Sequence, residues 1–349
     1  MIKTLLVSLS LAVLPGQAAM PPAPPAPPIA SIEAPDVSDI QFTITPRTRD
    51  GHAQLSLSYG GENRGRNQQS GPQAWDDLRG LSRADLDRDP PAAVAFQIVR
   101  PAGVIACSGV AGGGAATGGC GFEAGGGFAD ALAARVGARP EIRHLFQLAL
   151  SDFRLETLDE LDRQDYARPS LNEVLALAIH DVDAAYVRGI AEAGYRLGSI
   201  NELVAFHIHG VTPDYIAEMA ALGPNFSRLP ARELMNMRIH GVTPAFAREM
   251  ASLGYGADEP GALVSMRIHQ VTPDFVRAID AAGYPDLPAS KLMAFGIHGV
   301  TPDYIREMGA AGYAGLSADQ LIALRIHGVD SDYARRMRAE GVTERRRPG

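Results

Sequence analysis

The chain has 349 residues and a formal net charge of −8, with 40 acidic side chains against 32 Lys and Arg. This balance gives no basic footprint for nucleic acid, and one tryptophan with few other aromatic residues argues against base-stacking platforms. The 46% hydrophobic content is that of a globular protein and excludes wholesale disorder.

The first 38 residues have the features of an export signal followed by a linker. Lys3 precedes an apolar stretch from Thr4 to Leu14, which predicts a signal peptide over residues 1–18. That stretch is shorter than the roughly 20 residues of a membrane-spanning helix; an uncleaved anchor is the alternative. Residues 19–38 contain the run PPAPPAPP, expected to be an extended linker because proline lacks an N–H. We therefore expect a periplasmic or secreted protein, with no transmembrane span after cleavage.

Residues 39–125 have the period-two alternation of strands and predict a small antiparallel β domain. Polar, Gly-rich residues 60–71 are expected to form a loop, and residues 75–86 are ambiguous, with Ser82 as the cap of a short helix. The five expected strands are Ile40–Ile44, Leu55–Tyr59, Val94–Ile98, Val104–Val110 and Thr117–Phe122.

The last two of these strands flank a glycine-rich tip and predict a disulfide. A hairpin folded about Gly113 and Gly114 sets Cys107 opposite Cys120. Directly opposite residues have Cβ atoms about 4.5–5.5 Å apart, which is close to disulfide reach, and an exported chain favours oxidised cysteines. A phosphate-binding loop is the alternative for this glycine-rich segment, but the Lys that such a loop needs is absent.

A phrase close to Ile-His-Gly-Val-Thr-Pro recurs every 29 to 31 residues through the second half of the chain. A fixed period of this size marks an array of stacked repeats. We expect residues 126–342 to hold a half-repeat beginning near Phe128, one degenerate repeat and six repeats with histidine, followed by a basic tail at 343–349. The overall class is then α+β: the small sheet domain, then an all-α solenoid of two-helix repeats. The repeated histidines are His180, His209, His240, His269, His298 and His327.

The repeated phrase combines helix-stop and helix-start signals. In most repeats glycine follows the histidine and ends the first helix, Thr caps the second helix, and Pro takes its first position. Asp183 and Asp330 replace Thr in the outer repeats. A further glycine in each repeat is expected to end the second helix. These glycines are Gly194, Gly223, Gly254, Gly283, Gly312 and Gly341. Apolar residues of the first helix, such as Leu203, Phe206 and Ile208, are expected to form its buried face.

We interpret the six histidines as structural residues at the ends of first helices. Equivalent positions in stacked helices are about 8–10 Å apart, whereas a metal ion needs each ligand within about 2.1 Å. A periplasmic metal or small-molecule sensor that uses these histidines is the alternative function. We expect no cofactor.

The chain has no HExxH, Gly-x-Ser-x-Gly or paired Cys-x-x-Cys motif, so we expect it not to be an enzyme. Charged positions that vary between the second helices of the repeats are the predicted surface for a protein or peptide partner. They are Asp214, Glu218, Arg248, Glu249, Arg277, Asp303, Arg306 and Glu307.

The repeat pattern, Ile-His-Gly-Val-Thr-Pro-x-Tyr/Phe-x-x-x-Met with Gly-Tyr after it, resembles repeats of bacterial envelope proteins. Some of these lie in the extracytoplasmic part of metallopeptidase antirepressors of the beta-lactam-sensor type. The resemblance covers about Leu171 to Val342, and the segment before Phe128 is similar to the domain that accompanies such repeats. The chain lacks the zinc motif and the membrane helices of those peptidases. The resemblance therefore implies an interaction or sensory module of envelope signalling, without peptidase activity.

Overall fold

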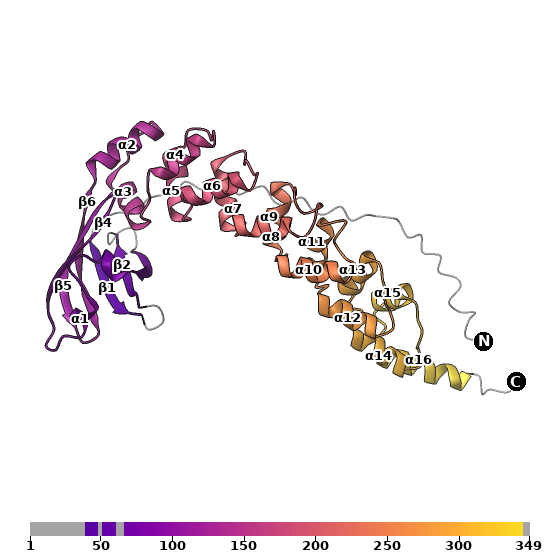
Figure 1. Ribbon diagram of the computed structural model, residues 1–349. Coiled ribbons are helices and arrows are strands. Elements are labelled where there is room, and N and C mark those ends of the chain that lie inside the picture. The colour runs from indigo at the N-terminus through magenta and orange to yellow at the C-terminus, as the bar shows by residue number, and fades with distance from the viewer. Residues whose placement is uncertain (1–38, 48–50, 61–65, 345–349) are drawn as a thin grey trace. The chain divides into compact units, whose positions relative to one another are not determined.

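The computed structural model describes residues 39–47, 51–60 and 66–344. The expected signal peptide, the proline-rich linker and the arginines of the tail lie outside these residues. The described chain forms two compact units that divide between residues 221 and 222, called here the N-terminal unit and the C-terminal unit. The N-terminal unit holds an antiparallel sheet and the helices that follow it, and the C-terminal unit is all helical (Figure 1).

The sheet has six strands in the order β3-β2-β1-β6-β5-β4. Alternating side chains such as Phe42, Leu57 and Ile105 are buried on one face, as the period-two pattern predicts. A short 3-10 helix and helix α1 supply further apolar residues to this core, including Leu78 and Leu86. The strands are β1 (Ile40–Pro46), β2 (Ala53–Tyr59), β3 (Asn67–Gln73), β4 (Ala92–Arg100), β5 (Gly103–Gly112) and β6 (Ala115–Ala124), and the two short helices are η1 (Trp75–Asp77) and α1 (Arg83–Leu86).

Strand β3 corrects the expectation of five strands. Its sequence NQQSGPQ lies within and just after the segment expected to be a loop, and it pairs with β2 along its whole length. It is an edge strand, so proline is tolerated there and no apolar alternation is needed. A polar edge strand therefore carries no period-two signal in the sequence.

The β5–β6 hairpin confirms the predicted register and the disulfide. Cys107 lies opposite Cys120 and Ile105 lies opposite Phe122, and the two cysteines are disulfide-bonded with their Cα atoms 4.0 Å apart. Gly113 and Gly114 form the turn with positive φ, which glycine adopts at little steric cost. The ambiguous segment before β4 contains the helix that Ser82 caps, with Asp85 completing the capping box.

Helices α2 to α8 complete the N-terminal unit, and α9 to α16 form the C-terminal unit. In each repeat a first helix ends at the histidine and a second helix begins after it. Within the N-terminal unit first helices pack on first helices (α3 on α5, α5 on α7) and second helices on second helices (α4 on α6, α6 on α8). The first helices of the C-terminal unit likewise pack in sequence, α9 on α11, α11 on α13 and α13 on α15.

The bounds of the helices in the N-terminal unit are α2 (Gly126–Val136), α3 (Ile142–Leu150), α4 (Glu156–Arg163), α5 (Leu171–Ile179), α6 (Ala184–Glu192), α7 (Ile200–Ile208) and α8 (Pro213–Ala220). Those of the C-terminal unit are α9 (Ala231–Ile239), α10 (Pro244–Ser252), α11 (Gly261–Ile268), α12 (Pro273–Ala281), α13 (Ala289–His298), α14 (Pro302–Ala310), α15 (Ala318–Ile326) and α16 (Ser331–Glu344).

The expected helix caps are present. The hydroxyl of Thr212 accepts a hydrogen bond from the backbone N–H three residues later, as do the equivalent Thr in three further repeats. Asp183 and Asp330 do the same with their carboxylates. Gly341 does not end its helix, because α16 continues to Glu344; glycine inside a helix costs only about 1 kcal/mol relative to alanine.

Tyrosine hydroxyls join successive repeats within each compact unit. Tyr186 of α6 donates to the carbonyl oxygen of Val211, 2.8 Å away, and Tyr304 of α14 donates to that of Val329 over the same distance. Both acceptors are the valine of the repeated phrase, one repeat further along the chain. Burial raises the pKa of Tyr186, so its hydroxyl remains a donor.

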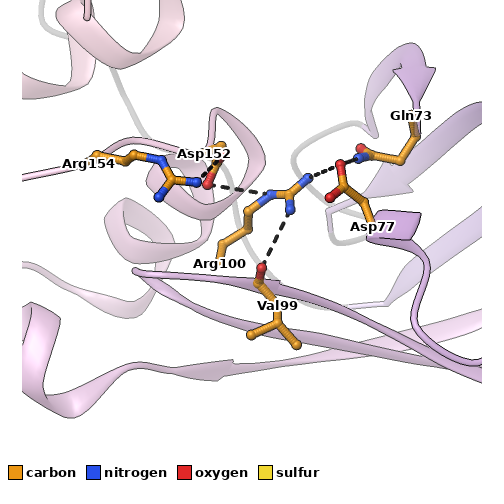
Figure 2. Close-up of polar contacts among 6 residues, drawn as sticks. All are labelled: Gln73, Asp77, Val99, Arg100, Asp152 and Arg154. Carbon is orange, nitrogen blue, oxygen red and sulfur yellow. Dashed lines mark hydrogen bonds and ion pairs between the residues drawn. The ribbon is translucent and has the colours of Figure 1, made fainter. Parts of the chain in front are cut away.

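Arg100 joins the sheet to the turn after α3 (Figure 2). Its side chain is 13% exposed and pairs with Asp77 at 3.2 Å and with Asp152 at 3.6 Å. It also donates to the carbonyl of Val99, while Arg154 pairs with Asp152 at 3.0 Å. A cavity of about 130 Å³ lies beside Arg100, between β2, β3 and the end of α3. Because two carboxylates balance this guanidinium, we interpret the cluster as a structural joint.

Candidate functional site

The histidines of the repeated phrase lie at the C-terminal ends of the first helices. Five of them are the residue that caps the helix end, and His298 is the last residue of α13. The first five are half-buried and His327 is exposed. Among the described residues, no three His, Cys, Asp or Glu side chains lie close enough together to hold a metal ion.

The isoleucine before each histidine is exposed to solvent. The exposed fractions of these six side chains lie between 37% and 56%. The valine two residues after the histidine is at most 2% exposed in the first five repeats. We call the six isoleucines the isoleucine row: Ile179 and Ile208 in the N-terminal unit, and Ile239, Ile268, Ile297 and Ile326 in the C-terminal unit.

This exposure corrects the expectation that Ile208 belongs to the buried face of its helix. Ile208 follows Phe206 by two residues, which is about 200° around a helix. Leu203 and Phe206, three residues apart, share the buried face and are at most 2% exposed. The isoleucine points away from that face and ends its helix in solvent.

The isoleucine row is unusual because a large, partly exposed apolar side chain recurs in it. Single exposed apolar residues are normal on protein surfaces. Here the same large apolar residue is exposed at the same position of six repeats. Because adjacent packed helices are about 8–10 Å apart, Ile239, Ile268, Ile297 and Ile326 form a periodic surface within the C-terminal unit.

Two arginines lie beside the row. The Arg267 guanidinium stacks over the ring of Phe246 at 4.9 Å, and that of Arg325 over the ring of Tyr304 at 4.8 Å. Arg325 also donates to the carbonyl oxygen of His298, 3.2 Å away and next to Ile297. Each arginine comes from the repeat after the aromatic residue, so each reaches back to the preceding histidine junction.

The two guanidinium groups lie close to the glycines that follow the repeated histidines. A Cβ atom on Gly241 would lie 3.1 Å from Nη2 of Arg267, and one on Gly299 would lie 2.8 Å from Nη2 of Arg325. Glycine therefore serves both the left-handed turn and the approach of the arginine. The sequence pattern did not indicate these arginines, because the residue before the isoleucine varies between repeats.

The charged residues predicted as a partner surface are all exposed on α8, α10, α12 and α14. Several of them neutralise one another. Arg306 pairs with Asp303 at 2.6 Å, and Arg277 pairs with both Asp274 and Glu249, at 2.9 and 3.4 Å. Such exposed pairs contribute little energy, and mixed signs give this surface no single charge preference.

Glu160 is a buried charged residue between second helices of the N-terminal unit. It is 1% exposed and accepts hydrogen bonds from Gln164 at 2.9 Å and Arg188 at 3.0 Å, with Arg163 also paired to it. The Gln164 amide, followed by the Arg188 and Arg163 guanidinium groups, holds the pKa of Glu160 below its usual value. These partners place Glu160 in the packing of α4 against α6.

No helix of the described chain is long and apolar enough to cross a membrane. The disulfide between Cys107 and Cys120 fits an extracytoplasmic location, where such bonds persist. No protein-family model matches the chain, and comparisons with curated proteins and with solved structures find no similar protein.

Proposed function

We propose that this protein is an exported, non-enzymatic interaction module of a bacterial cell envelope, which binds a protein or peptide partner through its helical repeats. One observation carries the proposal: the isoleucine row exposes the same apolar residue at the same place in six repeats. An exposed apolar surface that recurs along an array is typical of an interaction site. The resemblance to antirepressor repeats agrees with a role in envelope signalling.

The row provides enough apolar surface for a specific contact. Burying an isoleucine completely contributes about 1.5–3 kcal/mol, and these side chains are already about half-buried. Two isoleucines covered by a partner would then contribute about 2 kcal/mol together, or about 30-fold in affinity. The charged second-helix surface would adjust specificity and association rate.

Partner capture from envelope extract tests the proposal. Tagged full-length protein is compared with the double variant Ile268→Ser/Ile297→Ser and with Val110→Ser, a control residue that is 50% exposed on the β5–β6 hairpin. We expect a specific cross-linked partner with the native protein and the control, and its loss with the double variant. Capture that survives the double variant would refute the role of the row.

A fourth protein in the same experiment decides between the two surfaces. The variant Arg277→Ser/Arg306→Ser removes two charges from the second helices. Loss of the partner with this variant, together with retention by Ile268→Ser/Ile297→Ser, would assign the site to the charged surface.

A further inference from the structure

Strand β3 leaves one of its two backbone edges open. It lies at the end of the sheet order, and in the described chain no backbone hydrogen bond joins it to any segment except β2. Residues 67–70 are exposed. Proteins usually protect such an edge with charged side chains, a bulge or a covering element. The sequence NQQSGPQ has no charged residue and pairs with β2 without a bulge, so the edge is available to another strand.

The groups of β3 that point to this edge can be identified from Pro72. Proline has no N–H for the pairing with β2, so within a strand it turns its nitrogen to a free edge. Hydrogen-bonding groups alternate between the two sides of a strand. Gln68 and Ser70 therefore turn their N–H and C=O groups to the same edge as Pro72. In this part of the described chain, two donors and three acceptors are open to an added strand.

A cavity of about 130 Å³ lies beside this edge strand. Its apolar walls include Leu57, Ile98 and Ile105, which are at most 4% exposed. Residues 69–73 of β3 also line it, and because Gln69 is exposed, the cavity opens to solvent along the strand. A cavity of roughly 150 Å³ holds benzene in another protein, so this one has room for a branched aliphatic side chain.

Gly71 of β3 keeps this cavity open. It lies opposite Leu55 in the β2–β3 pair, on the face of the sheet that carries the core. A Cβ atom on Gly71 would meet no atom within 4 Å, so packing within the described chain does not require glycine here. Glycine inside a strand weakens it and often marks the close approach of a ligand or another backbone. The missing side chain therefore leaves space for a group from outside the chain.

The charge around the cavity is balanced. Among the described residues that line it, Arg100 alone is charged, and Asp77 and Asp152 pair with its guanidinium (Figure 2). A charged group in the cavity would lose its hydration without gaining an unpaired partner, which is costly. An uncharged side chain therefore complements the cavity.

We propose that β3 binds an extended segment of a partner protein by strand addition, with an uncharged aliphatic side chain of that segment in the cavity beside Gly71. Main-chain hydrogen bonds to Gln68, Ser70 and Pro72 hold the segment, and the cavity selects the side chain. Strand-addition domains divide affinity and specificity in this way. Side chains alternate along a strand, so every second residue of the segment turns to the cavity side. This is a second site, in addition to the isoleucine row.

Short peptides of defined sequence test the proposal on the full-length protein. Their frame is Thr-Ser-Thr-X-Thr-Ser-Thr, with Leu, Asp or Lys at X, and a fourth peptide has Leu at X and methyl groups on all its backbone nitrogens. Fluorescence anisotropy of the labelled peptides measures affinity. We expect the Leu peptide to bind at least about tenfold more tightly than the Asp and Lys peptides, as burial of a leucine predicts. The methylated peptide should not bind, because it lacks the main-chain donors.

Protein variants identify the contacts. Gly71→Val fills the cavity from the edge strand and should weaken binding of the Leu peptide about tenfold. Gly121→Val is the matched control, because a Cβ atom at this position of β6 also meets no atom within 4 Å, and it should leave binding unchanged. Gln68→Pro removes one outward N–H without changing the pairing with β2, and should weaken binding about fivefold. Circular dichroism verifies the fold of each variant.

Hydrogen exchange locates the bound peptide. The N–H groups of Gln68 and Ser70 should exchange rapidly in the free protein and slowly with the Leu peptide present. Protection in the free protein would mean that the edge is already covered, by a second copy if dilution removes the protection and by the chain itself if it does not, and either result would overturn the proposal. So would a failure of the Leu peptide to bind, equal binding of the Leu and Asp peptides, or equal effects of Gly71→Val and Gly121→Val.

Discussion

The tyrosine that joins one repeat to the next provides the sharpest test of how the array is held together. In Tyr186→Phe the ring remains, still packed at 4.6 Å against His207, and only the hydroxyl is lost. The carbonyl oxygen of Val211 then has no donor from Tyr186, and Val211 is 0% exposed, so water does not replace it. A buried group left without its partner costs about 1–3 kcal/mol. We expect a destabilisation of about 1.5 kcal/mol.

The same change at two other repeats makes the comparison quantitative. Tyr304→Phe removes an equivalent bond to Val329 in the C-terminal unit and should have a similar cost. Tyr333 occupies the equivalent position in the last described repeat, is 43% exposed, and should tolerate phenylalanine within about 0.5 kcal/mol.

Guanidinium unfolding measures these effects through two signals. The chain has one tryptophan, Trp75, which lies in the N-terminal unit and reports Tyr186→Phe, while helical circular dichroism reports both units. Similar midpoints for Tyr186→Phe, Tyr333→Phe and the native protein would refute the reasoning, since the joining bond would then contribute nothing.

Four further predictions concern stability. Replacing Cys107 and Cys120 by serine should cost about 3 kcal/mol, the chain-entropy value for a loop of this length, and thiol labelling of native exported protein should find neither cysteine free. Gly296→Ala should destabilise by about 1–3 kcal/mol, because the added Cβ meets the carbonyl of His269. Gly309→Ala, where a Cβ meets no atom within 4 Å, should stabilise by about 0.5–1 kcal/mol. Guanidinium unfolding measures both glycine variants. Glu160 has a lowered pKa, so its contribution to stability is present above its unfolded pKa and lost as pH falls through the folded value. Unfolding free energies measured between pH 7 and pH 3 should therefore fall less in Glu160→Gln than in the native protein.

Local chemistry explains which parts of the fold could be predicted from the sequence. The Thr caps, the proline at the first helical position and the glycines with positive φ each act within a few residues, so each is visible in the repeated phrase. The hairpin register follows in the same way from the symmetry about Gly113, and it correctly sets Cys107 opposite Cys120. Strand β3 (Asn67–Gln73) carries no such local signal. It is a polar edge strand, and it forms because it pairs with β2, which lies elsewhere in the sequence.

Burial of the repeated isoleucine could not be read from its recurrence. The phrase keeps both Ile208 and Val211, and both are large apolar residues, but only the valine is buried. Helical periodicity separates the exposed Ile208 from the buried Val211 only when it is known that the helix ends at Ile208. The arginines of the candidate site were missed because Arg267 and Arg325 contact residues of the previous repeat, which a residue-by-residue interpretation of one repeat does not reveal.

A repeat that keeps one exposed residue constant restricts the form of its ligand. Other surface positions vary between repeats: the position ten residues after the isoleucine is Glu218 in one repeat, Glu249 in the next and Arg336 in the last. Such a position offers a different contact in each repeat, so it suits an irregular partner surface. The isoleucine offers the same contact at each step of about 8–10 Å, and a ligand gains from successive contacts only if its own apolar groups recur with that spacing. A globular partner seldom has such a period along one line, whereas an extended segment with an apolar residue in every third position does. If the isoleucine row is the partner site, as proposed, the constancy of the isoleucine favours a linear ligand over a globular one.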